Sequence, residues 1–157
     1  GDRVVVSSDT VGSGRELIGA RSMEPDLANN RIYVLDYNGN ALVSIDLATG
    51  DRATISDNST VGAGPALGNP LDFEVDLPNN RALLANQTGR NLMQVDLVTG
   101  DRTILAGSGV GTGPTDSSGA YYVALDNAND RAFVYDLVLT GVIVVDLNTG
   151  NRVVMSK

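Results

Sequence analysis

Short runs of Val, Ile, Leu, Tyr and Phe recur along the chain between clusters of Gly, Asn and Asp. Such runs predict β-strands bounded by turns. No stretch keeps an apolar stripe at helical spacing, so no long helix is expected. The strands fall into three groups of four. The predicted strands are 23–27, 32–35, 42–47 and 53–56, then 71–77, 82–85, 92–97 and 103–106, then 121–125, 132–135, 142–147 and 153–156.

The grouping follows an internal repeat of the sequence. Residues 95–102 read VDLVTGDR, residues 45–52 read IDLATGDR and residues 145–152 read VDLNTGNR, while GDR also opens the chain. A fixed period of this size is typical of solenoids and propellers. We therefore divide one domain, 1–157, into the units 2–50, 51–100 and 101–150 with a partial unit 151–157.

The repeated polar residues are explained by turns. In the DLxTG segments the Asp side chain is expected to accept backbone N–H groups two or three residues on, and the Gly to take a positive φ. The DLANNR, DLPNNR and DNANDR segments (26–31, 76–81 and 126–131) are expected to form the other hairpin turn, with Asn at positive φ. We interpret these Asp residues as structural.

The strand order predicts a β-propeller. Tight turns require antiparallel neighbours, and the run Val142-Ile143-Val144-Val145 is apolar on both faces, which is typical of a sheet covered on both sides. Four antiparallel strands covered by neighbouring units form a propeller blade. A stacked β-helix has parallel pairing, and a β-sandwich leaves the repeat unexplained. The predicted fold is all-β, with three four-stranded blades and one extra outer strand at 3–7.

Three blades do not close a ring, because closed propellers carry roughly four to eight. We expect half of a six-bladed ring and leave two explanations open. Either a homodimer completes the ring, or the chain is a fragment of a longer one. The extra strand at 3–7 would compete with 153–156 of a second copy, which favours the fragment.

Residues 70–76 (PLDFEVD), 80–86 (NRALLAN) and 92–100 (LMQVDLVTG) resemble NHL-type repeats and the related SMP-30/gluconolactonase propellers. The resemblance covers the whole chain and implies a six-bladed ring. In the SMP-30-like enzymes it also implies a divalent metal held by Glu, Asn and Asp at the channel mouth. The sequence also resembles YVTN-type surface propellers. An extracellular, periplasmic or cell-surface location is expected.

The composition of the chain excludes several kinds of partner and several kinds of site. Eleven basic and nineteen acidic residues give a net charge of −8, which disfavours nucleic acid and anionic membranes as partners. No apolar run approaches the roughly 20 residues of a membrane helix, so membrane insertion is not expected. The sequence has no Cys and no His. Disulfides, thiolate metal sites and His-based triads are thereby excluded.

The loops between the second and third strands differ among the units, as binding loops on a rigid scaffold do. The candidate ligand-binding residues are Tyr37, Asn40, Gln87, Arg90 and Tyr121. Asp36, Asn86 and Asp136 occupy equivalent positions and would form an oxygen ring suited to Ca²⁺ if they converge; otherwise each caps its own loop. Beyond Ca²⁺ no cofactor is expected. The carboxylates of Glu24, Asp72 and Glu74 on first strands are a further candidate, for acid–base chemistry.

These features favour a non-catalytic propeller module that binds a protein or a small molecule through its loops. One alternative is a divalent-metal-dependent hydrolase of the SMP-30/gluconolactonase kind. Another is an extracellular structural repeat without a discrete ligand.

Overall fold

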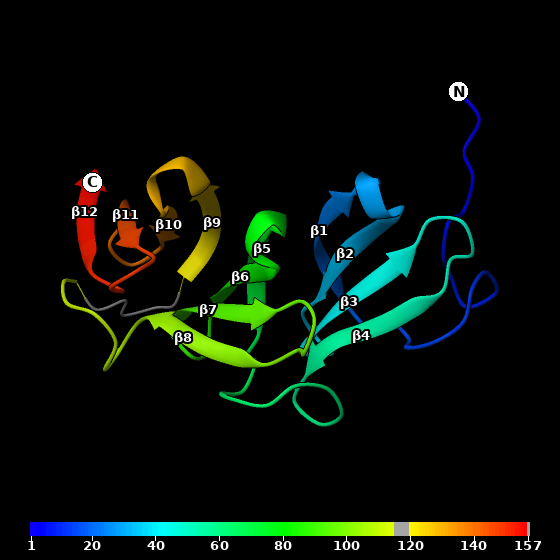
Figure 1. Cartoon of the computed structure of the whole chain (residues 1–157), viewed down its shortest axis with the longest axis horizontal. Helices are drawn as coiled ribbons and strands as arrows, with labels where there is room; N and C mark the ends of the chain where they lie inside the picture. The colour runs from blue at the N-terminus through cyan, green and yellow to red at the C-terminus, as the bar shows by residue number, and fades with distance from the viewer. Residues whose placement is uncertain (115–119, 157) are drawn as a thin grey trace.

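The computed structural model describes residues 1–114 and 120–156, which form three separate four-stranded antiparallel sheets (Figure 1). In each sheet the strands lie in sequence order. The all-β, blade-type prediction is confirmed. No described helix is long and apolar enough to cross a membrane. The first blade contains β1 (Ala20–Asp26), β2 (Arg31–Asp36), β3 (Ala41–Asp46) and β4 (Arg52–Asp57); the second contains β5 (Pro70–Asp76), β6 (Arg81–Asn86), β7 (Asn91–Asp96) and β8 (Arg102–Ala106); the third contains β9 (Ala120–Asp126), β10 (Arg131–Asp136), β11 (Gly141–Asp146) and β12 (Arg152–Ser156).

The three blades follow one another along an arc, with the two chain ends at its opposite ends (Figure 1). The first strands lie next to each other: β1 contacts β5, and β5 contacts β9. The fourth strands lie at the other edge of each sheet. This is the arrangement of propeller blades around a central axis. Each blade takes its fourth strand from the start of the next sequence unit, so the blades are offset from the repeats.

Two hydrophobic clusters hold the blades together. The side chains of one blade that point toward the next blade form its trailing face, and those that point toward the preceding blade form its leading face. The trailing face of the first blade contributes Tyr33, Leu35 and Leu42, which pack with Phe73 and Leu84 on the leading face of the second. The second and third blades pack in the same way. That cluster joins Leu83, Ala85 and Leu92 to Val123, Val134, Ile143 and Val145.

The turns have the predicted chemistry. Asp46 Oδ1 accepts the backbone N–H groups of Ala48 and Thr49, and the same pair of bonds recurs at the two equivalent turns. Gly50 has the expected positive φ, as do its two counterparts. The first turn of each blade is a short 3-10 helix that ends in a left-handed residue, which is Asn30 in the first blade. The repeated Asp residues are therefore structural at these positions.

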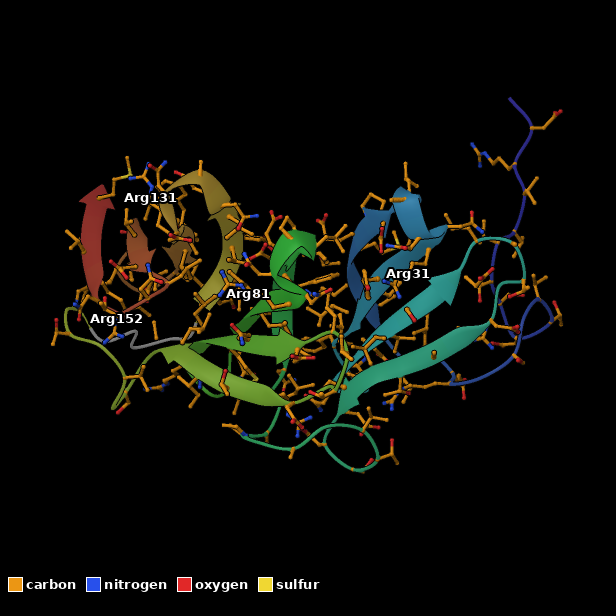
Figure 2. The ribbon with its side chains drawn as sticks, viewed as in Figure 1. Arg31, Arg81, Arg131 and Arg152 are labelled. Atoms are coloured by element: carbon orange, nitrogen blue, oxygen red, sulfur yellow. The ribbon has the colours of Figure 1, made fainter. Side chains whose placement is uncertain are left out.

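An arginine at the start of each second strand binds the Asp at the end of the first strand, and Figure 2 labels these three arginines. Arg31, Arg81 and Arg131 each donate from Nε to the Asp at the end of the neighbouring strand, at 2.7–2.9 Å. In the second blade that Asp is Asp76. Burial tends to raise its pKa, but the hydrogen bonds from Asn79 and Arg81 outweigh burial and hold the pKa below its usual range.

The first residue of each fourth strand is also an arginine, and it joins two blades. Arg102 is buried; its Nε donates to the carbonyl oxygen of Pro65 at 2.8 Å, and its Nη1 donates to Ser56 Oγ at 2.7 Å and to the carbonyl oxygen of Asp57 at 2.6 Å. The equivalent arginines of β4 and β12 bond to the segments before their own blades. We call this contact the arginine latch. It fixes each blade to the chain segment that precedes it.

The extra strand predicted at 3–7 is not formed. Residues 1–6 form no strand and are exposed, and no strand among residues 1–114 and 120–156 lies beside them to pair with. The segment nevertheless occupies the position of a fourth strand. Ser7 Oγ donates to the carbonyl oxygen of Gly50 at 2.7 Å and accepts from Arg52, just as Ser56 does with Gly100 and Arg102. The sequence identified the position correctly and the secondary structure wrongly.

Candidate functional site

The loops between the second and third strands have the same backbone conformation in all three blades, but their side chains differ. All three are four-residue turns whose last residue, Asn40, Arg90 or Thr140, has a φ of 45–51°. Because the strands alternate in direction, these loops lie at one end of the blades, and the Asp-Leu turns lie at the other. We call the first end the loop face. The loops are 37–40 (YNGN), 87–90 (QTGR) and 137–140 (LVLT).

The residues proposed as metal ligands are buried at the ends of the second strands. Asp36 accepts N–H groups from Ile18, Gly19 and Gly39. Arg15 supplies the nearest positive charge, 4.0 Å from its Oδ2. Both carboxylate oxygens of Asp36 are thereby engaged by the chain itself.

The two equivalent residues also accept backbone N–H groups, although the buried Oδ2 of Asp136 has no hydrogen-bond partner among the described residues. Asn86 Oδ1 accepts the N–H of Gly68, and Asp136 Oδ1 accepts the N–H groups of Val138 and Leu139. Each side chain bonds within its own blade and its flanking loops. Among residues 1–114 and 120–156, no group of three His, Cys, Asp or Glu is placed to hold a metal ion. No hydrogen bond among the described residues joins any two of these three side chains, and the oxygen ring stays a prediction.

Of the five predicted ligand-binding residues, Asn40, Gln87 and Tyr121 make contacts between blades. Asn40 Oδ1 accepts the N–H of Asn69 at 2.8 Å, which ties the first blade to the second. Gln87 Nε2 donates to the Tyr121 hydroxyl at 3.1 Å, which ties the second to the third. These side chains hold the loop face together, and their polar groups are already partly occupied.

The other two predicted residues lie in the turns of the loop face, where Tyr37 is half-buried. The guanidinium of Arg21 lies 5.1 Å from the ring centre of Tyr37, a cation–π contact. Arg90 is exposed. The structure adds two residues that sequence reasoning missed, Leu137 and Val138, whose exposed fractions are 46% and 57%. Their apolar character in a four-residue turn was the available signal.

The inner strands bring three carboxylates together. Asp72 on β5 accepts from Ser22 Oγ on β1 at 2.9 Å and from the N–H of Val123 on β9 at 3.1 Å, so one side chain links all three blades. Burial, followed by the charge of Asp72, raises the pKa of Glu24. Burial, then the charges of Glu24 and Asp72, raises the pKa of Glu74. The hydrogen bonds of Asp72 give it a structural role.

The trailing face of the third blade is an apolar groove. It is lined by Tyr122, Ala124, Phe133, Tyr135 and Val142. The rings of Tyr122 and Tyr135 lie 6.4 Å apart, and Tyr122 is 60% exposed. In the first two blades the next blade buries the matching face. Within the described residues nothing covers this one.

No protein-family model matches the sequence, and no curated protein sequence is significantly similar to it. Solved structures do share the fold. A chain of a nidogen/laminin complex aligns over 87% of this chain with a TM-score of 0.67 and 14% identity. Hydrazine synthase of Kuenenia stuttgartiensis aligns over 94% with a TM-score of 0.62 and 11% identity, and U3-55K over 94% with a TM-score of 0.65 and 9% identity.

These similarities establish a β-propeller-like fold and no activity. This chain covers 46%, 38% and 42% of those three chains, which is less than half of each. The specific NHL or SMP-30 relationship is not supported by a family match.

Proposed function

We propose that this chain is a non-catalytic propeller module that binds a protein partner through the loop face. The observation that carries the proposal is the contrast within the three loops. Their backbones are the same, while their side chains change from polar in the first two to apolar in the third. A constant scaffold with variable loop side chains is the usual construction of a binding surface.

The composition of the surface fits a protein partner. Leu137 and Val138 form an exposed apolar tip, while Tyr37 and Arg90 lie at the equivalent loops. Tyrosine and arginine are enriched at protein interfaces, where an apolar centre is surrounded by polar groups. The contacts of Asn40 and Gln87 between blades keep the loops at fixed spacing, which lowers the entropy cost of binding.

The hydrolase alternative is less well supported by the same loops. A lactonase-like mechanism needs side-chain oxygens that are free to bind a cation. The oxygens of Asp36 accept three backbone N–H groups, and replacing those bonds with a metal would open the loops. Binding through the loop side chains requires no such rearrangement.

A displayed random-peptide library, selected against the immobilised chain, tests the proposal. The selected peptides are expected to lose at least about tenfold in affinity, roughly 1.4 kcal/mol, when Leu137→Ser and Val138→Ser are combined. Val98→Ser is the matched control, because Val98 is an exposed apolar residue in a turn at the opposite end. Peptides that bind both variants equally, or a library that yields no specific peptide, would contradict the proposal.

A further inference from the structure

The first blade has a polar hollow at the end opposite to the loop face. The hollow has a volume of about 430 Å³, and its lining includes Arg31, Ser44, Asp46, Asp51, Arg52 and Ala53. These residues come from the ends of strands β2, β3 and β4 and from the turn between β3 and β4. Small-molecule sites in proteins typically have volumes of roughly 300–1,000 Å³, so the hollow is large enough to hold a ligand.

The strand register places the polar side chains of the hollow next to one another on the trailing face. Arg31 on β2 pairs with Asp46 on β3. Ser44 lies two positions before Asp46, on the same face of β3, and pairs with Ala53 on β4. A guanidinium, a hydroxyl and a carboxylate are therefore neighbours, and the small side chain of Ala53 leaves room beside them.

Arg31 is held in place by two contacts and still has free donors. Its Nε donates to Asp26 at 2.9 Å, and its guanidinium carbon lies 5.0 Å from the ring centre of the buried Tyr33 (Figure 2 labels Arg31). Among residues 1–114 and 120–156, neither Nη atom of Arg31 makes a hydrogen bond, and neither does the hydroxyl of Ser44. A guanidinium fixed in this way can donate to a ligand with little further loss of side-chain entropy.

The other two blades differ from the first at the positions that keep the hollow polar and open. In the second blade Gln94 replaces Ser44, and Arg81 Nη1 donates to Gln94 Oε1 at 3.2 Å, so this arginine is bound by its own blade. In the third blade the hollow has a volume of about 300 Å³, and its lining includes Val144 and Val153. The shape of the hollow thus belongs to the repeat, whereas the small polar lining is a feature of the first blade.

The charges around the hollow disfavour a simple ion as its ligand. Arg31 and Arg52 supply two positive charges, and Asp46 and Asp51 supply two negative charges, so the charges cancel. A lone anion would be repelled by the carboxylates, and a lone cation by the guanidinium groups. Among the described residues no group of three His, Cys, Asp or Glu is placed to hold a metal ion. The lining therefore suits a neutral ligand with many hydrogen-bonding groups.

From these features we infer that the hollow of the first blade binds a neutral saccharide unit, either free or at the end of a glycan. Each sugar hydroxyl can both donate and accept a hydrogen bond. Neighbouring hydroxyls accept from the Nη groups of Arg31 and donate to Oδ2 of Asp46, whose Oδ1 caps its turn. Ser44 supplies a further contact. The site lies at the opposite end of the blade from the loop face, so it is independent of the proposed protein partner.

Amide NMR spectra of the isotope-labelled chain, titrated with glucose, galactose, mannose and N-acetylglucosamine, test the inference. At least one of these neutral sugars is expected to cause saturable shifts at residues 31 and 44–53. Glucosamine and glucuronic acid carry a charge, and each is expected to cause smaller shifts at the same concentration. No saturable shift in this region with any neutral sugar, or larger shifts with the charged compounds, overturns the inference.

Two substitutions of Ser44 introduce side chains that the other blades already carry at this position. Ser44→Val removes the hydroxyl, and Ser44→Gln fills the hollow and binds Arg31. Both variants are expected to keep a folded spectrum and to lose the sugar-dependent shifts. Thr103→Val is the matched control, because Thr103 is an exposed strand position of the second blade, and it should leave the shifts unchanged. Shifts that survive both Ser44 substitutions overturn the inference.

The second blade allows the reverse experiment. At the positions that line the hollow, it differs from the first blade only at Gln94 and Thr103. Gln94→Ser combined with Thr103→Ala therefore reproduces the complete lining and is expected to give a second set of saturable shifts, at residues 81 and 94–103. If no second set appears, the assignment of the site to these side chains is overturned.

A glycan array probed with the labelled chain distinguishes the two sources of the sugar. Binding to glycans that end in the sugar identified by NMR, and its loss with Ser44→Val, would assign the site to glycan ends. Binding of that sugar in solution without binding to the array would assign it to the free saccharide.

Discussion

The side chain of Arg102 donates to Ser56 Oγ at 2.7 Å across the boundary between the first and second blades. The same guanidinium binds the carbonyl oxygens of Asp57 and Pro65. These bonds join the end of β4 and the connection that follows it to the start of β8. The stability of the arc therefore depends on buried polar contacts as well as on its two hydrophobic clusters.

Replacing the arginine of the latch should destabilise the folded chain. Arg102→Met is expected to lower the free energy of unfolding by about 2–4 kcal/mol, because it leaves several buried acceptors without a donor. Urea denaturation monitored by circular dichroism measures the change. Arg90→Met is the control, since Arg90 is exposed, and it should change the free energy by less than about 0.5 kcal/mol. Equal losses for the two variants would show that the latch is not stabilising.

Substitutions at two glycines distinguish the effect of steric overlap from the effect of backbone strain. Gly62 and Gly109 have φ values of 80° and 86°, but a Cβ at Gly62 would overlap the carbonyl oxygen of Gly100, whereas a Cβ at Gly109 meets nothing. Gly109→Ala should lower the free energy of unfolding by about 1 kcal/mol, because it introduces only backbone strain. Gly62→Ala should cost at least about 2 kcal/mol more, because the blade boundary must shift. Thermal denaturation of both variants provides the comparison, and similar melting temperatures would contradict the overlap.

Thr140 is a β-branched residue at φ 48°, a conformation that favours Gly or Asn. Thr140→Asn is expected to raise the free energy of unfolding by about 0.5–1 kcal/mol, by relieving this strain. Thr103→Asn, on an exposed strand position, should have the opposite sign, because Asn is unfavourable in strands. Chemical denaturation measures both. A loss of stability with Thr140→Asn would mean that the turn is different in solution.

The raised pKa of Glu74 has a defined effect on stability. The folded chain holds this proton more tightly than the unfolded chain does, so the stabilising contribution is present at low pH and is lost as pH rises through the folded-state pKa. Glu74→Gln is therefore expected to stabilise the protein at pH 7, by less than about 1 kcal/mol because the group is partly screened by solvent. The gain should vanish below the ordinary glutamate pKa of about 4.3.

Unfolding of this variant and of the wild type from pH 3 to pH 8 provides the measurement. Glu16→Gln serves as the control, because Glu16 is exposed and should show little change at any pH. If the stability gain from Glu74→Gln grew toward low pH, it would have the wrong sign and would contradict the prediction.

The strands and turns were predictable because each depends on residues close in sequence. Asp46 and Gly50 recur with their turn in every unit, so the repeat itself separated structural Asp from candidate ligands. The role of Ser7 was not predictable in this way. A strand needs a neighbour, and the pattern in residues 3–7 does not tell whether the described part of the chain places a strand beside them.

The contacts of the loop residues were harder to predict, because they join different blades. Gln87 and Tyr121 are 34 positions apart, and neither is repeated in the other units. Their pairing depends on the distance between two blades, which local patterns do not contain. Leu137 and Val138 could have been noticed, since two apolar residues in a tight turn depart from the polar loops of the other units.

The position of the arginine latch bears on how such a chain gains or loses blades during evolution. A duplicated unit that starts at β5 would leave its arginine without Ser56 and the carbonyl oxygens of Asp57 and Pro65. A unit that runs from Ser56 to the end of β8 carries its own acceptors and can be inserted without loss. Recombination within the fourth strand therefore preserves the fold, whereas recombination between sheets does not.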